Sequence, residues 1–160
     1  LGALLTQLAS KAGARVIATA SKGNHAALRE LGADLAIDYR DSDIADQIMG
    51  ETGNRGVDAS FDTAGGNVAL STLVTRPFGR IATILPPDGD LSALYTKNQT
   101  LFGTFLTREG ARLREMTPLF ERGQARVIVE SVLPLEDVAK AHERLDSGHG
   151  RGKVILQVGQ

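Results

Sequence analysis

A serine and a lysine, Ser21 and Lys22, follow a short apolar run at residues 16–20, where a strand of a nucleotide-binding fold would end. A fold of this kind that prefers NAD usually carries Asp or Glu about 20 residues after its glycine turn, because a carboxylate accepts hydrogen bonds from the ribose hydroxyls. A carboxylate would repel a phosphate on that ribose, whereas a hydroxyl and an ammonium group can bind one. The residue types therefore predict a site for NADP.

Short apolar strands alternate with helical patterns along the chain, and these elements must position any such site. The predicted strands cover residues 16–20, 35–37, 57–61, 79–85, 100–106, 125–129 and 153–158. The predicted helices cover residues 3–12, 23–31, 42–49, 65–73, 108–122 and 135–147. In the helix over residues 108–122, helical spacing predicts that Leu113 and Phe120 face inward. Strands that alternate with helices favour right-handed crossovers, so the sequence predicts an α/β fold with a doubly wound parallel sheet.

Length and composition limit what the chain can be. A chain of 160 residues and 17.0 kDa is expected to form one domain over residues 1–160. The 18 Lys and Arg residues nearly balance the 19 Asp and Glu residues, and aromatic residues make up only 4%, which argues against a nucleic-acid surface. Cysteine is absent from this sequence, which agrees with a cytoplasmic location. No apolar run is long enough to cross a bilayer, so we expect no membrane partner.

Several short stretches occur in one order along nearly the whole chain. They are residues 14–21, 30–34, 37–40, 56–58, 61–62, 79–81, 147–149 and 152–156. At this spacing the chain resembles the cofactor-binding domain of the medium-chain dehydrogenases and reductases, in particular the quinone oxidoreductases related to zeta-crystallin. Residues 130–160 resemble the C-terminal helix and strand that return to the substrate domain of that family. Because Gly2 resembles the last glycine of the family's glycine-rich turn, we expect the first strand and the N-terminal substrate domain to be missing here.

The resemblance implies a cofactor site built from residues at the ends of the strands, the edge where open α/β sheets bind ligands. The implied site residues are Gly2, Thr19, Ser21, Lys22, Tyr39, Arg40, Thr63, Ala64, Gly65, Leu85, Phe102, Gly103 and Thr104. Tyr39 is expected beside the adenosine phosphate, and the backbone of residues 102–104 is expected to hold the nicotinamide amide. The strand that contains Phe102 and Leu106 commonly pairs with its twin in the family, so a homodimer is expected.

The resemblance also implies an activity, namely hydride transfer from NADPH to a quinone, an enone or a related carbonyl compound. No catalytic residue is named, because the family's substrate-polarising groups lie largely in the domain expected to be missing, and this chain alone is expected to be inactive. The histidines His25, His142 and His149 lack the spacing of metal ligands, so no metal site is predicted. Two alternatives stay open, a relative of the zinc-dependent alcohol dehydrogenases and a non-catalytic protein that binds NADPH.

Overall fold

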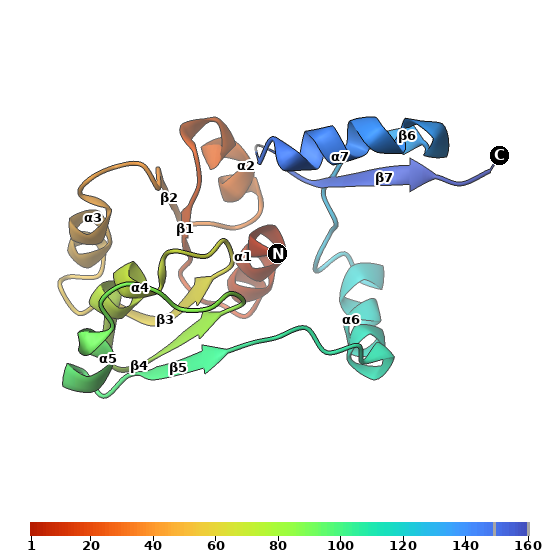
Figure 1. Ribbon diagram of the computed structural model, residues 1–160. Coiled ribbons are helices and arrows are strands. Elements are labelled where there is room, and N and C mark those ends of the chain that lie inside the picture. Colours follow the sequence, from red (N-terminus) through yellow and green to blue (C-terminus); the bar gives the residue numbers. More distant parts are fainter. Residues whose placement is uncertain (149, 160) are drawn as a thin grey trace.

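Helices and parallel strands alternate along the chain (Figure 1). The computed structural model describes residues 1–148 and 150–159. Its helices are α1 (Gly2–Lys11), α2 (His25–Glu30), α3 (Ile44–Glu51), α4 (Val68–Val74), α5 (Ser92–Thr96), α6 (Gly110–Glu121) and α7 (Val138–Asp146), with 3₁₀ turns η1 (Lys22–Asn24) and η2 (Leu135–Asp137). Its strands are β1 (Ile17–Thr19), β2 (Leu35–Ile37), β3 (Val57–Asp62), β4 (Thr75–Thr83), β5 (Thr100–Gly103), β6 (Val129–Pro134) and β7 (Lys153–Gln157). The strand pairs of the described residues are parallel, which confirms the predicted α/β class.

The strands form three separate sheets, β1–β2, β3–β4–β5 and β6–β7. Strands β1 and β2 pair in register up to Thr19 opposite Ile37. In the second sheet, Asp62 at the end of β3 lies opposite Thr83 of β4, which lies opposite Gly103 of β5. Within residues 1–148 and 150–159, one edge of β1 and one edge of β3 therefore have no partner strand.

Helix α1 runs from the end of β3 to the start of β2. At its first residue, a Cβ atom on Gly2 would lie 3.2 Å from Oγ1 of Thr63, which follows β3. At its last turn, Ser10 contacts Gly32 so closely that a Cβ atom on this glycine would clash with it, and Gly32 precedes β2. The N-terminus of α1 therefore lies at the edge where β3 ends.

The main core lies between the first two sheets and the helices α3 and α4. Its buried residues are Ile37 on β2, Ile48 on α3 and Val74 on α4. Partly buried residues pack around them, namely Ile17, Leu35, Ile44, Ala45, Met49, Val57 and Leu70. Burial of each large aliphatic side chain stabilises the fold by roughly 1.5–3 kcal/mol, so this core fixes where β2 ends.

The C-terminal elements β6, α7 and β7 form a unit in which α7 lies along β7 (Figure 1). Glu130 of β6 organises this unit: Nε of Arg144 donates to its Oε1 atom (2.8 Å) and the backbone N–H of Arg151 donates to Oε2 (2.9 Å). The Arg151 guanidinium then donates to Oδ1 of Asn24 (2.8 Å) and to the carbonyl of Gly23 (3.1 Å). The unit is thus joined to the turn after β1, and the single domain over residues 1–160 stays a prediction.

The strand predicted over residues 125–129 is wrong, because β6 begins only at Val129. The backbone of Arg126 is bound by the side chain of Gln7 on α1 instead of by a strand. Nε2 of Gln7 donates to the carbonyl of Arg126 (3.1 Å), and the N–H of Arg126 donates to Oε1 of Gln7 (2.9 Å). This long-range contact holds the segment in an irregular conformation.

Several further predictions differ from the structure, among them the helix predicted over residues 65–73, since α4 begins only at Val68 and ends at Val74. Strand β4 covers residues 75–83 instead of 79–85, because the N–H of Leu85 donates to the hydroxyl of Thr83 (3.2 Å) and the chain turns there. Strand β5 ends at Gly103 instead of Leu106, and the short helix α5 was not predicted. Leu113 is 71% exposed, so its predicted inward orientation on α6 is wrong. No helix in the described part of the chain is both long and apolar enough to span a lipid bilayer.

Candidate functional site

The predicted residues at the ends of β1 and β2 lie together. Thr19, the last residue of β1, pairs with Ile37, the last residue of β2. Ser21 follows just before the turn η1, and Lys22 begins this turn and donates its backbone N–H to Oδ2 of Asp38 (3.3 Å). Because parallel strands end at one edge of a sheet, the turn that carries Lys22 lies beside the segment that follows β2.

The buried carboxylate of Asp38 organises this first cluster. Its side chain is only 3% exposed, and Arg40 pairs with it through two hydrogen bonds, from Nε to Oδ1 (2.9 Å) and from Nη2 to Oδ2 (2.6 Å). The backbone N–H of Arg40 also donates to Oδ1 (3.0 Å). These hydrogen bonds, above all those from the Arg40 side chain, hold the pKa of Asp38 far below its ordinary value, although burial alone would raise it. Asp38 is therefore ionised, and Arg40 balances its charge.

Three side chains of the cluster reach the surface. The Arg40 side chain is 61% exposed, and its Cζ atom lies 5.8 Å from the centre of the Tyr39 ring. Tyr39 is 57% exposed, and Lys22 is exposed as well. A guanidinium and an ammonium group donate to phosphate oxygens, and an aromatic ring can cover a planar group. The residues present at the ends of β1 and β2 therefore fit a phosphorylated nucleotide.

A second cluster follows β3, where the predicted residues Ala64 and Gly65 form a turn. Asp62, at the end of β3, is 4% exposed and accepts hydrogen bonds from the N–H groups of Ala64 (3.1 Å), Gly65 (2.8 Å) and Asn67 (3.1 Å). Burial alone would raise the pKa of Asp62, but the hydrogen bonds from Gly65, Asn67 and Ala64 together lower it. The ionised carboxylate thus fixes the shape of the turn.

Two glycines bring this turn close to neighbouring elements. Gly65 has φ +89°, and a Cβ atom there would lie 2.6 Å from Cδ1 of Leu85, which follows β4. Gly2 lies beside Thr63 at the start of α1, where a Cβ atom would lie 3.2 Å from the threonine hydroxyl. Glycine permits both the positive φ and the close approach of backbone and neighbour. The structure therefore brings Gly2, Thr63, Gly65 and Leu85 together at one edge.

The predicted residues at the end of β5 join the second cluster through β4. Gly103 pairs with Thr83, and the N–H of Thr104 donates to the Thr83 carbonyl (2.8 Å). Phe102 is 50% exposed on the same strand. No hydrogen bond or ion pair connects the first cluster to the second within residues 1–148 and 150–159. The predicted site thus consists of two groups that end two different sheets.

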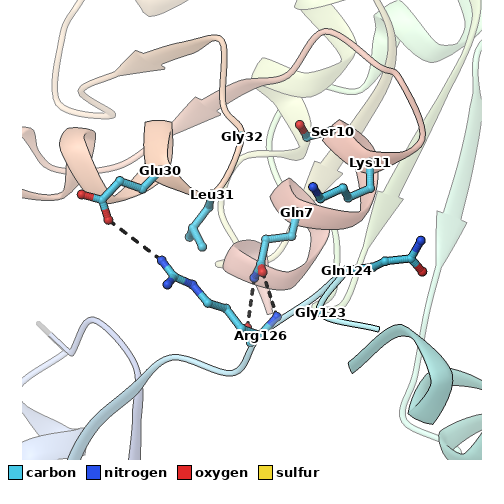
Figure 2. Close-up of a pocket in the computed structure, with 9 residues that line it drawn as sticks. All are labelled: Gln7, Ser10, Lys11, Glu30, Leu31, Gly32, Gly123, Gln124 and Arg126. Carbon is cyan, nitrogen blue, oxygen red and sulfur yellow. Dashed lines mark hydrogen bonds and ion pairs between the residues drawn. The ribbon is translucent and has the colours of Figure 1, made fainter. Parts of the chain in front are cut away.

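A small hollow of about 220 Å³ lies away from both groups (Figure 2). It is lined by Gln7, Ser10, Lys11, Glu30, Leu31, Gly32, Gly123, Gln124 and Arg126. Figure 2 shows the Gln7 side chain pointing to the backbone of Arg126 and the Arg126 side chain pointing to Glu30, where a guanidinium nitrogen lies 4.0 Å from the carboxylate. The hollow is at the C-terminal ends of α1 and α2, whereas the predicted residues lie where the strands end. It is also smaller than usual cofactor pockets of roughly 300–1,000 Å³.

Sequence reasoning missed the two carboxylates that organise the clusters, Asp38 and Asp62. Each stands between an apolar strand and a turn, and each accepts N–H groups from residues that follow it. An Asp at this position could have been predicted to organise the turn, because Asp side chains commonly bind the backbone of the next turn.

Groups of three or more His, Cys, Asp or Glu side chains that could hold a metal ion are absent among the residues that the structure describes. His149, which the sequence analysis considered, lies outside the described residues.

Comparison with known proteins adds three kinds of similarity. The family model for zinc-binding dehydrogenases matches residues 31–156. Among curated proteins, the chain is 25% identical to the medium chain reductase pydE of an Acremonium species, over 99% of this chain and 48% of that protein. It is 29% identical to an NADPH-dependent alkenal/one oxidoreductase of Arabidopsis thaliana, over 98% of this chain and 37% of that protein. The chain thus spans less than half the length of these relatives.

Solved structures share the fold. An NAD-dependent alcohol dehydrogenase is 29% identical, with a TM-score of 0.88 over 98% of this chain and 48% of the other. A mycobacterial quinone oxidoreductase is also 29% identical, with a TM-score of 0.81 over 98% of this chain and 53% of the other. In both cases this chain corresponds to about half of the solved one.

Proposed function

The chain belongs to the family of zinc-binding dehydrogenases, and from this premise we propose that it is the cofactor-binding part of an NADPH-dependent oxidoreductase. The proposed reaction transfers hydride to a quinone, an enone or a related carbonyl compound. The names of two similar proteins, the alkenal/one oxidoreductase and the quinone oxidoreductase, support this choice of substrate. When bound, the nicotinamide supplies the hydride, and the residues of this chain bind and orient the cofactor.

The observation that carries the proposal is the pair of exposed cations at the ends of β1 and β2. Lys22 and Arg40 come from adjacent strand ends, and the single buried carboxylate between them is already paired with Arg40. A phosphate on the adenosine ribose carries the charge that these cations bind, whereas NADH lacks it. The cation pair therefore supports NADPH as the preferred cofactor.

The second cluster supports contacts farther along the cofactor. The glycines Gly2 and Gly65 leave room for a ligand to approach the backbone, and the carboxylate of Asp62 holds the turn rigid. Backbone groups near Phe102 are proposed to hold the nicotinamide amide. No residue is proposed as a general acid or base.

The second candidate is a relative of alcohol dehydrogenases that uses NAD. It is favoured by the likeness to the solved NAD-dependent alcohol dehydrogenase, at a TM-score of 0.88. The two candidates differ in the cofactor that should bind more tightly, so one measurement separates them.

The test is a fluorescence titration that measures the dissociation constants of NADPH and of NADH for the unmodified full chain and for its Lys22→Ala variant. A charge-assisted hydrogen bond contributes about 1.5–3 kcal/mol, so the loss of Lys22 should weaken NADPH binding about tenfold to a hundredfold and spare NADH. Lys11→Ala is the matched control, since Lys11 is an exposed lysine at the far end of α1. Tighter binding of NADH by the unmodified protein would favour the alcohol dehydrogenase alternative.

We further propose a homodimer that forms through β5, the edge strand of its sheet. Phe102 on β5 is 50% exposed, and Phe105 and Leu106 in the segment after it are 89% and 80% exposed, so apolar surface is available for a second copy. A small-molecule substrate and a cytoplasmic location complete the proposal, although the similar Arabidopsis protein is named as chloroplastic.

A further inference from the structure

We infer that Asp38 is a specificity-determining positioning residue, which holds the turn of Lys22 and the guanidinium of Arg40 in place for the 2′-phosphate of NADP. The inference rests on the proposed preference for NADPH and deepens it. It concerns a side chain that would not itself touch the cofactor.

Both oxygens of the Asp38 carboxylate accept hydrogen bonds from residues of the cluster. Oδ1 accepts from the backbone N–H and from Nε of Arg40, and Oδ2 accepts from Nη2 of Arg40 and from the N–H of Lys22. An ionised carboxylate has about four acceptor sites, so these four donors use its capacity. Because the side chain is also 3% exposed, Asp38 cannot serve as the carboxylate that binds ribose hydroxyls in NAD-preferring folds.

The Arg40 guanidinium binds Asp38 through only one of its edges. Its five N–H donors form a planar fork, and the pair with Asp38 uses only the edge formed by Nε and Nη2. The Nη1 group takes no part in this pair, and the side chain as a whole is 61% exposed. Asp38 therefore fixes one edge of the fork and leaves the outer end free to bind a phosphate in a two-point arrangement.

The Asp38 carboxylate also connects the two cationic residues, Lys22 and Arg40. Lys22 lies after β1 and Arg40 after β2, and both are anchored to the same side chain. The turn of Lys22 is also closed by a hydrogen bond from the N–H of Asn24 to the carbonyl of Ser21 (2.8 Å). Lys22 and Arg40 therefore place two positive charges on the exposed side of the cluster, and the carboxylate of Asp41 also acts on Arg40.

The test compares the dissociation constants of NADPH and NADH for the full chain and for its Asp38→Asn variant. Asparagine has nearly the same size, but its amide has one acceptor oxygen and a donor NH2 group, so it cannot accept the four hydrogen bonds that Asp38 accepts on two oxygens. The expected result is that NADPH binding weakens about tenfold while NADH binding changes less than about twofold, so the selectivity ratio falls. If Asp38 had a merely structural role, the variant would weaken the binding of both cofactors alike and leave the selectivity ratio for NADPH over NADH unchanged.

Matched variants test whether the change in selectivity comes from the pair of Asp38 and Arg40. Asp58→Asn removes an exposed ion pair with Arg76, whose Nε atom lies 2.6 Å from Oδ1 of Asp58, and should leave the selectivity ratio unchanged. If Asp38 acts through Arg40, then Asp38→Asn should lower the ratio much less in an Arg40→Ala background, because coupled residues are not additive. If Asp38→Asn does not fold, Arg40→Lys replaces it, since this variant keeps the charge and loses the fork, and it should lower the ratio several-fold.

The possible results distinguish the role of Asp38 from the proposed preference for NADPH. A protein that prefers NADPH, loses this preference in Lys22→Ala and keeps it in Asp38→Asn would overturn the inference and leave the proposed function standing. A protein without any preference for NADPH would overturn both. A lower selectivity ratio in Asp38→Asn, together with an unchanged ratio in Asp58→Asn, supports the inference.

Discussion

Replacement of Gly65 by alanine tests the close contact between the turn after β3 and the segment after β4. Gly65 has φ +89°, a conformation that costs a residue with a Cβ atom about 1–2 kcal/mol. The new Cβ atom would also lie 2.6 Å from Cδ1 of Leu85, and overpacking of this kind costs about 1–3 kcal/mol. Because Leu85 is 46% exposed and Cδ1 is the end of a flexible side chain, the lower part of that range applies. We expect Gly65→Ala to lower the free energy of unfolding by about 2–3 kcal/mol.

The neighbouring residue provides the control for this prediction. Gly66 has φ +76°, but nothing lies within 4 Å of the position that its Cβ atom would occupy, so Gly66→Ala measures the backbone cost alone. Urea unfolding of the full chain gives both values, and Gly65→Ala should cost about 1 kcal/mol more than Gly66→Ala. In a Leu85→Ala background the difference should disappear. Equal costs in the presence of Leu85, or a difference that persists without it, would refute the contact.

Two further predictions concern side chains that connect distant parts of the chain. Gln7→Ala should lower the free energy of unfolding, measured in urea, by about 1–3 kcal/mol, because the backbone N–H and carbonyl of Arg126 lose their partner. The control is Gln124→Ala, at an exposed residue of the same hollow, which should leave the free energy of unfolding unchanged. The Arg144 side chain lowers the pKa of Glu130 from its ordinary value of 4.5, so the stability that this carboxylate contributes is present above that pH and is lost as the pH falls below it. Thermal unfolding should therefore show Glu130→Gln to be less stable than the unmodified protein near neutral pH, with a gap that narrows in acid. A gap of constant size would contradict this reasoning.

The elements that depend on local sequence could be predicted. The strand at residues 35–37 matches β2, because three apolar residues lie between two turns and need no distant partner to be recognised. Gly13 and Gly32 have φ +84° and +98°, and they end helices as their positions indicate. The parallel pairing of the strands could then be predicted from the alternation of strands and helices.

The features that depend on distant contacts could not be predicted. Gln7, which lies far away in the sequence, binds the backbone of Arg126, and β6 begins only after this irregular segment, at Val129. Leu113 fits the inward face of a helix, but α6 packs only through its second half, where Phe120 is partly buried. In the candidate site, cationic and glycine residues could be recognised by type, whereas the role of Asp38 depends on which donors the fold brings to it.

The parallel pairing of the strands has a consequence for how the chain reaches its native state. No paired strands in the described residues are joined by a hairpin, since a helix separates each pair, so a long loop must close before any ladder can form. Such non-local contacts make folding slow compared with helical bundles. During that interval the open edges of β1 and β3 are templates for strands of other molecules, so the yield of refolding should fall as protein concentration rises.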